Sequence, residues 1–137
     1  MATRTTAFVG LLLVSLAACS GNPNQPGSIP LGQAFDLRAG ATAAVEGGLA
    51  MSFDRVVHDS RCAIDAICVW EGDAVLVVTL SSVAGPPASY EIHTQPLQSE
   101  VGHGSFLVKL TALSPYPRSN RPTNPEDFVA TFKVTSR

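Results

Sequence analysis

The sequence predicts an all-β domain, an antiparallel β-sandwich of the immunoglobulin-like kind, with a small β-barrel as the alternative. Apolar residues recur at every second position in about seven short segments after residue 34, which is the period of half-buried strands. Turn-forming glycines and prolines separate these segments. No segment of this region keeps the period of a helix, and such a pattern is typical of a sandwich.

The expected strands follow in chain order. Phe35 and Leu37 share one face of the first, and Leu49, Met51 and Phe53 share one face of another. The clearest alternation comes next. Its inward side is expected to carry Trp70, Gly72, Ala74, Leu76, Val78 and Leu80.

Three further alternating segments complete the domain. Their expected inward residues are Tyr90, Ile92, Phe106, Val108, Leu110, Ala112, Phe128, Ala130, Phe132 and Val134. Turns are expected at 47–48, 85–87 and 102–104, where glycines and prolines gather.

The N-terminus carries an export signal. Arg4 precedes an apolar run at residues 7–14, which is too short to span a bilayer, since a spanning helix needs roughly 20 residues. The run ends in Leu16-Ala17-Ala18-Cys19, which resembles the lipobox of bacterial lipoproteins; a plain signal peptide with a chance cysteine is the alternative. The resemblance implies removal of residues 1–18, lipidation of Cys19 and a membrane anchor that does not span the bilayer. Ser20 after the lipidated cysteine resembles the outer-membrane sorting pattern of Gram-negative bacteria.

Composition divides the rest of the chain. Residues 19–33 are polar and rich in proline and glycine, so we expect a lipidated N-terminus followed by a flexible linker. Residues 34–137 are expected to form the β-sandwich domain, and a domain of this size can bury a core without added staples.

The charge of the chain argues against nucleic acid. Cleavage before Cys19 leaves eight basic and eleven acidic residues, without the clustered basic face of a nucleic-acid-binding protein. Adhesion to anionic lipid also requires grouped basic residues. We therefore expect contact with the membrane through the N-terminal lipid alone.

The chain has three cysteines. With Cys19 lipidated, Cys62 and Cys68 are left as an even pair, and an oxidising compartment favours a disulfide between them. Such a short ring contributes only about 2 kcal/mol in the chain-entropy model. Zinc held by these cysteines and His58 is disfavoured, because the spacing of structural zinc sites is missing.

The cysteines belong to a longer motif. The run Asp59-Ser60-Arg61-Cys62, five residues, then Cys68-Val69-Trp70-x-Gly72-x-Ala74 resembles a signature of small, uncharacterised secreted and lipid-anchored bacterial β-sandwich proteins. Leu110-x-x-Leu113-x-Pro115-Tyr116-Pro117 resembles a later block of the same family. The resemblance implies localisation and fold and brings no established activity. The sequence departs from the family pattern at Ala63, in place of proline, and at Glu71, in place of a small residue.

Two interpretations of the first block compete. In the structural one, Trp70 fills the core below the stapled loop and Arg61 pairs with Asp59 or Asp65. In the functional one, the loop is a recognition surface that includes Asp59, Arg61 and Asp65, because a rigid loop has a lower ordering cost on binding.

A calcium site is a weaker alternative. Its oxygen ligands would be Asp59, Asp65, Glu71 and Asp73, but no calcium-loop spacing is present. We therefore predict no metal and no cofactor.

Catalytic motifs are also missing. His58, His93 and His103 are scattered, and the chain has no Gly-x-Ser-x-Gly elbow. We expect a protein that is not an enzyme; a small envelope hydrolase, or an inhibitor of one, is the alternative.

Residues 114–125 contain four prolines and predict a long exposed connection. Tyr116, Arg118 and Arg121 have the composition of a contact patch, whereas a simple crossover loop is the structural alternative. The leading hypothesis is a lipid-anchored, non-enzymatic binding or structural module of the cell envelope that contacts a protein or glycan through its loops.

Overall fold

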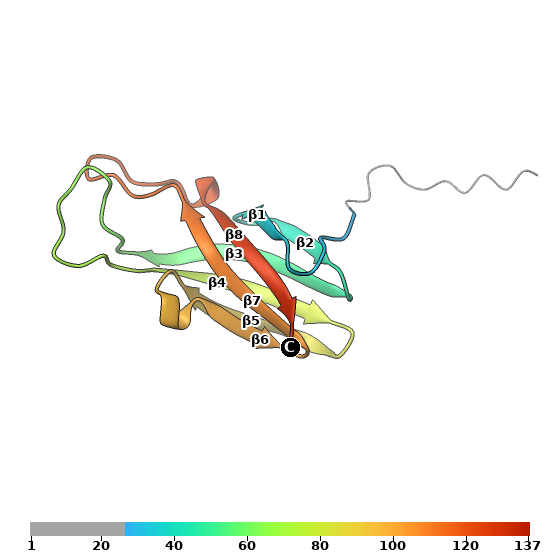
Figure 1. The fold of residues 1–137 in the computed structure, drawn as a ribbon. Helices are drawn as coiled ribbons and strands as arrows, with labels where there is room; N and C mark the ends of the chain where they lie inside the picture. The colour runs from blue at the N-terminus through green and yellow to red at the C-terminus, as the bar shows by residue number, and fades with distance from the viewer. Residues whose placement is uncertain (1–26) are drawn as a thin grey trace, which may run out of the picture.

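The computed structural model describes residues 27–137, so the predicted signal peptide, Cys19 and most of the predicted linker lie outside the described residues. Eight strands form two antiparallel sheets that pack face to face (Figure 1). The strands span Ala34–Arg38 (β1), Thr42–Val45 (β2), Leu49–Asp59 (β3), Ala74–Ser82 (β4), Gly85–His93 (β5), Glu100–His103 (β6), Phe106–Ser114 (β7) and Val129–Ser136 (β8), with short 3₁₀ turns at Pro96–Gln98 (η1) and Pro125–Asp127 (η2). The predicted β-sandwich is confirmed, and the described strands do not close into a barrel.

The strand order is simple. One sheet has the order β1-β8-β7-β6 and the other β2-β3-β4-β5, so every pair except β1 and β8 joins strands that follow one another along the chain. Immunoglobulin domains instead pair strands from distant parts of the chain. This domain therefore has their two-layer architecture with a meandering chain order.

The core lies between the two sheets. Leu49, Met51 and Phe53 point inward from β3 and are almost completely buried, as their alternation predicts. Phe53 meets Phe132 of β8 edge to face, with ring centroids 6.1 Å apart, an arrangement that aromatic rings favour. This contact links the two layers at the centre of the domain.

Three inward positions differ from the prediction. Trp70 is 82% exposed and Gly72 is not in a strand, because β4 begins only at Ala74 and the chain before it is a loop; the prediction that Trp70 fills the core is wrong. Leu113 rather than Ala112 is buried at the end of β7, because the register shifts between Leu110 and Ala112. A bulge of this kind moves the following side chains to the opposite faces.

The last part of the predicted linker packs on the sandwich. The Ile29 amide donates to the carbonyl of Ala44 at 2.9 Å, and the amide of Gly32 donates to the carbonyl of Val134 at 2.7 Å. Ala44 lies on β2 and Val134 on β8, so this segment contacts both sheets. The folded body therefore begins a few residues before the predicted boundary at residue 34.

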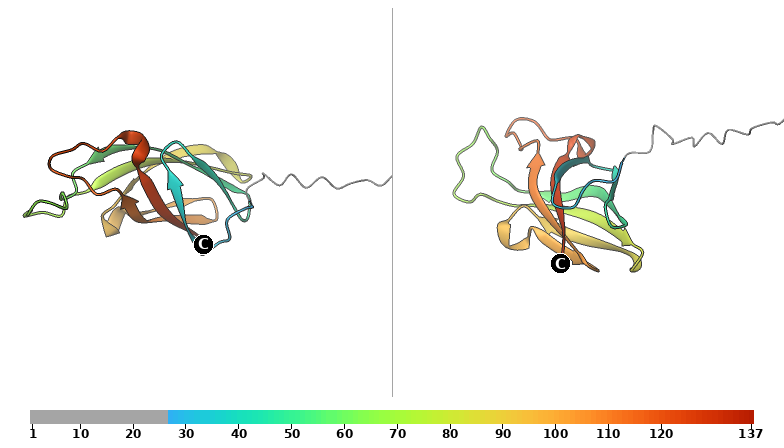
Figure 2. Two further views of the ribbon diagram at one scale, coloured as in Figure 1. Left: turned by 90° about the horizontal axis from the view of Figure 1, so that it is seen from above. Right: turned by 45° about the vertical axis from the view of Figure 1, so that its right-hand side comes forward.

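Two long connections lie at one end of the sandwich. We call residues 60–73, between β3 and β4, the disulfide loop, and residues 115–124, after β7, the proline loop. Both project on the side away from residue 27, where the described chain begins, in the views of Figures 1 and 2. Neither helical turn within residues 27–137 is long and apolar enough to span a membrane.

Candidate functional site: the joined loop end

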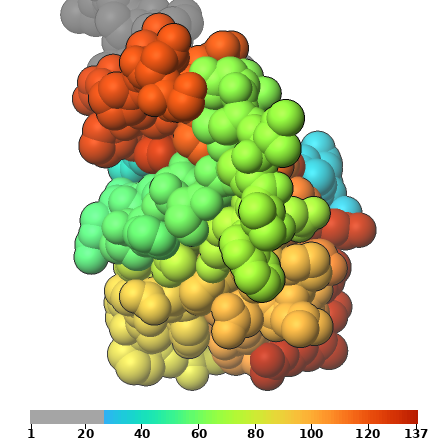
Figure 3. All heavy atoms as spheres, turned by 90° about the vertical axis from the view of Figure 1, so that its left-hand side faces the viewer, coloured from blue at the N-terminus to red at the C-terminus, as the bar shows by residue number. Residues whose placement is uncertain are grey.

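The disulfide loop and the proline loop lie side by side and form one surface, which we call the loop end (Figure 3). Cys62 and Cys68 form the predicted disulfide. At the base of the loop the Ser60 amide donates to the carbonyl of Asp73 at 2.7 Å, and the Cys62 amide donates to the carbonyl of Glu71 at 2.9 Å. These bonds extend the pairing of β3 with β4 into the loop, so its base is ordered.

Arg61 connects the two loops from within. Its guanidinium donates to both carboxylate oxygens of Asp59, at 2.9 and 2.8 Å, and to the carbonyls of Leu113 and Pro115. Only 8% of Arg61 is exposed. The paired carboxylate and the carbonyls compensate the buried charge, so Arg61 holds the end of β7 and the start of the proline loop against β3.

Tyr116 adds a stacking contact to this junction. The Arg61 guanidinium lies 4.6 Å from the centre of the Tyr116 ring, within the range of a cation–π interaction. More than half of Tyr116 stays exposed. The ring therefore belongs both to the support of the loop end and to its surface.

Asp65 ties the tip of the disulfide loop to the proline loop. Its carboxylate accepts hydrogen bonds from the amide and the hydroxyl of Ser119, at 2.9 and 2.8 Å, and next to it the Ile64 amide donates to the carbonyl of Pro117 at 3.1 Å. The hydrogen bonds from Ser119 hold the pKa of Asp65 below its ordinary value of 3.8. Asp65 therefore stays charged and keeps these bonds at neutral pH.

Gly72 is required where the loop returns to the sandwich. Its backbone has φ of +71°, a conformation that side chains disfavour. A Cβ atom there would overlap the carbonyl of Ser60. The glycine of the motif thus allows the two ends of the loop to approach each other.

Asp73 anchors the other side of the loop. Its carboxylate contacts His93 and accepts hydrogen bonds from the amide and hydroxyl of Thr94, at 3.1 and 2.9 Å. Partial burial raises the pKa of Asp73, but the hydrogen bonds from His93, Thr94 and Gln95 outweigh it and hold the pKa below 3.8. The carboxylate therefore joins the start of β4 to the end of β5.

The surface of the disulfide loop is apolar. Ile67 and Val69 are almost fully exposed, and Trp70 and Ile64 are more than half exposed. The disulfide and the hydrogen bonds described above hold the backbone that carries them. These side chains are therefore displayed on an ordered loop without a partner among the described residues.

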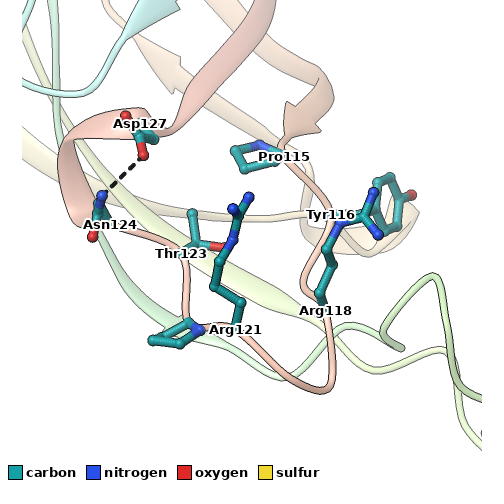
Figure 4. A pocket seen from close by; sticks show the side chains of 8 residues that line it. Pro115, Tyr116, Arg118, Arg121, Thr123, Asn124 and Asp127 are labelled. Carbon is teal, nitrogen blue, oxygen red and sulfur yellow. Dashed lines mark hydrogen bonds between the residues drawn. The ribbon is translucent and has the colours of Figure 1, made fainter.

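A shallow pocket of about 330 Å³, which we call the arginine pocket, opens in the proline loop beside this surface (Figure 4). The side chains of Arg118 and Arg121 extend into it toward Tyr116 and Pro115. It is lined by Pro115, Tyr116, Arg118, Arg121, Pro122, Thr123, Asn124 and Asp127.

Known proteins give no guide to this site. Compared with family models, with curated proteins and with solved structures, the chain shows no significant match.

The structure separates the residues predicted for recognition. Tyr116, Arg118 and Arg121 are exposed at the loop end, as is Asp65. Arg61 is buried and its guanidinium is paired with Asp59, so these two side chains offer little exposed area at the loop end. Their pairing is one of the two that the structural interpretation predicts for Arg61.

Within residues 27–137 the predicted metal ligands and histidines are not brought together. Asp59, Asp65 and Asp73 have separate partners, and within residues 27–137 no three metal-ligating side chains gather. His58 on β3 and His93 on β5 are both cross-strand partners of Val75, which lies on β4 between them. The two histidines are therefore two strand spacings, or roughly 10 Å, apart.

Sequence reasoning missed two features of the site. The bond from Ser119 to Asp65 joins residues that are 54 positions apart, and no local pattern indicates it. The exposure of Trp70 did have a signal, because the continuous apolar run from Ile67 to Trp70 breaks the two-residue alternation of a strand.

Proposed function

We propose that this chain is a membrane-anchored, non-enzymatic binding module of the bacterial cell envelope, and that the loop end is its recognition surface for a partner protein. The observation that carries the proposal is the exposure of Ile67, Val69 and Trp70 together on a loop closed by a disulfide. Grouped apolar side chains of this size mark interaction sites, whereas isolated exposed ones are common on any surface.

The distribution of exposed side chains supports this choice of surface. Ile64, Ile67, Val69 and Trp70 fall within one short segment. The other fully exposed large apolar residues, Val83 and Leu97, lie singly at the β4–β5 turn and in η1. Within residues 27–137, only the disulfide loop therefore groups several exposed large apolar side chains in one short segment.

The order of the loop end also favours binding. Arg61, Asp65 and the disulfide fix the backbone before any partner arrives. A loop that is already ordered loses less conformational entropy when it binds. The surface thus combines apolar side chains with a low ordering cost.

The direction of the loop end agrees with an N-terminal anchor. The described chain begins at residue 27, on the side of the sandwich away from both loops (Figure 2). The lipid that the Leu16-Ala17-Ala18-Cys19 lipobox implies would therefore attach on the side of the sandwich away from the loop end, which leaves the loop end free for a partner.

A protein partner fits the surface better than a glycan. Ile67 and Val69 supply aliphatic contact area, and protein interfaces have apolar centres rich in aromatic residues and arginine. Trp, Tyr and Arg are the residues most often found at interface hot spots, and all three are present at the loop end.

The proposal is tested by capturing partners of the tagged full chain from detergent-solubilised envelopes. We expect Trp70→Ser to lose a protein that the parent chain retains. Val83→Ser, which removes an exposed apolar side chain from the β4–β5 turn, is expected to retain it. Equal recovery with both variants, or no specific protein with the parent chain, would overturn the proposal.

A further inference from the structure

The arginine pocket is formed on a fixed turn. Arg118 and Arg121 face each other in a β-bridge, and the Arg121 amide donates to the carbonyl of Arg118 at 3.4 Å. Between them lie Ser119 and Asn120, and Asp65 accepts two hydrogen bonds from Ser119. The backbone positions of the two arginines are therefore fixed by contacts with the disulfide loop as well as by the turn itself.

Both guanidinium groups are unpaired within residues 27–137. The ion pairs of arginine and lysine in this region join Arg61 to Asp59 and Lys109 to Glu100. None of its side-chain hydrogen bonds uses the guanidinium of Arg118 or Arg121. Each guanidinium offers five N–H donors, and both side chains line this pocket, that of Arg118 beside Tyr116 and that of Arg121 toward Pro115 (Figure 4).

The charge of the pocket suits a ligand with one negative charge. Against the two arginines stands one carboxylate in the lining, Asp127, which accepts a hydrogen bond from the side-chain amide of Asn124 at 3.2 Å. The lining itself therefore keeps a net positive charge of one, and Asp65, whose pKa the charge of Arg118 helps to lower, lies outside it. A carboxylate balances a single positive charge, whereas a doubly charged phosphate exceeds it.

The size and walls of the pocket set a further limit. Its volume of about 330 Å³ lies at the lower end of ligand-binding pockets. Pro115, Pro122 and Tyr116 supply apolar walls, and Thr123 supplies a hydroxyl group. The space fits a short acidic side chain better than an extended ligand.

We infer that the arginine pocket binds a carboxylate of the partner protein, an acidic side chain that accepts hydrogen bonds from the guanidinium groups of Arg118 and Arg121 that line it. This inference rests on the proposed function, because it adds a charged contact beside the apolar one at the same loop end. Planar guanidinium groups match the geometry of carboxylates and form two parallel bonds with them.

The test is a titration of the purified protein with acetyl-Ala-Glu-Ala-amide, followed by the backbone amide NMR signals of residues 118–123. We expect saturable shifts with this peptide and none with the matching glutamine peptide. Arg118→Gln and Arg121→Gln are each expected to weaken binding about tenfold. Arg55→Gln, which removes the same charge from an exposed position on β3, is expected to leave binding unchanged.

Three results would overturn the inference: equal shifts with both peptides, saturation by inorganic phosphate without saturation by the glutamate peptide, or an equal loss with Arg55→Gln. These outcomes do not depend on recovery of a partner through Trp70. A negative titration would therefore overturn the carboxylate site but not the apolar recognition surface. A negative capture experiment would overturn the proposed function, and the titration would still show whether the pocket binds a carboxylate.

Discussion

The guanidinium of Arg61 lies 4.6 Å from the centre of the Tyr116 ring, although the two residues belong to different loops on different sheets. The same guanidinium is paired with Asp59 and donates to the carbonyl of Leu113 at the end of β7 and to that of Pro115 in the proline loop. Two connections that a sandwich could leave independent are thereby joined into one surface. The binding interpretation of this chain depends on that junction.

Removal of Asp59 should destabilise the whole domain. Asp59→Ala leaves the buried Arg61 charge without its carboxylate, and loss of one partner of a buried pair costs about 3 kcal/mol or more. Urea unfolding measures this change in free energy. Lys109→Ala, which breaks the exposed pair with Glu100, is the control and is expected to cost at most about 1 kcal/mol. Equal effects of the two substitutions would mean that Arg61 is not the junction described here.

Gly72 should tolerate no side chain. In Gly72→Ala the new methyl group overlaps the Ser60 carbonyl and also has to adopt a positive φ, so we expect a loss of about 3 kcal/mol or more. Gly32 has a similar φ of +82° with open space around it. Gly32→Ala should therefore cost only the backbone strain, roughly 1–2 kcal/mol. Thermal unfolding of the two variants separates the steric effect from the conformational one.

Acid should weaken the bond network at Asp73. Its pKa is lower in the folded protein than its ordinary value of 3.8, so folding favours the charged carboxylate. The stabilisation is complete well above that value and is lost as the pH falls through the folded pKa. Asp73→Asn should be less stable than the parent chain at neutral pH, by roughly 2 kcal/mol, and the difference should shrink toward pH 2. A constant difference across this range, or an NMR titration of Asp73 above 3.8, would contradict the account.

The disulfide should matter more for the order of the loop than for the stability of the domain. Cys62→Ser with Cys68→Ser opens a ring with a sequence separation of 6, for which the chain-entropy model gives only about 2 kcal/mol. Hydrogen exchange of the amides in residues 62–71 is expected to accelerate strongly. The buried amides of β4 and β8 serve as the internal control and should change only with global stability. Unchanged exchange in the loop would show that Arg61 and Asp65 order it without the bridge.

Alternation predicted the body of the sandwich because successive side chains of a strand point to opposite faces. Apolar residues at every second position therefore indicate which face is buried. Leu49, Met51 and Phe53 are examples. The same rule failed at Trp70, where the pattern was extended backward through a loop, and at Ala112, where a bulge changes the register of β7. Both errors lie where local periodicity ends, and period alone does not mark those points.

The support of the site was only partly predictable. Pairing of Arg61 with Asp59 is local and was among the expected possibilities. Its burial depends on the carbonyls of Leu113 and Pro115, which are 52 and 54 positions away. The disulfide was predicted because two cysteines remain once Cys19 is assigned to the lipid. The exposure of the apolar side chains beside it was not predicted, because it depends on the direction in which the loop projects from the sheets.

The central claim, that the loop end is the recognition surface, is tested most directly by photocrosslinking in intact cells. A photoreactive amino acid is placed at Ile67 or Trp70 at the loop end, and at Val83 or Leu97 elsewhere on the surface; all four side chains are largely exposed. We predict a discrete protein adduct from positions 67 and 70 that is missing from positions 83 and 97. Adducts with lipid alone at the loop end, or the same protein adduct at all four positions, would contradict the account.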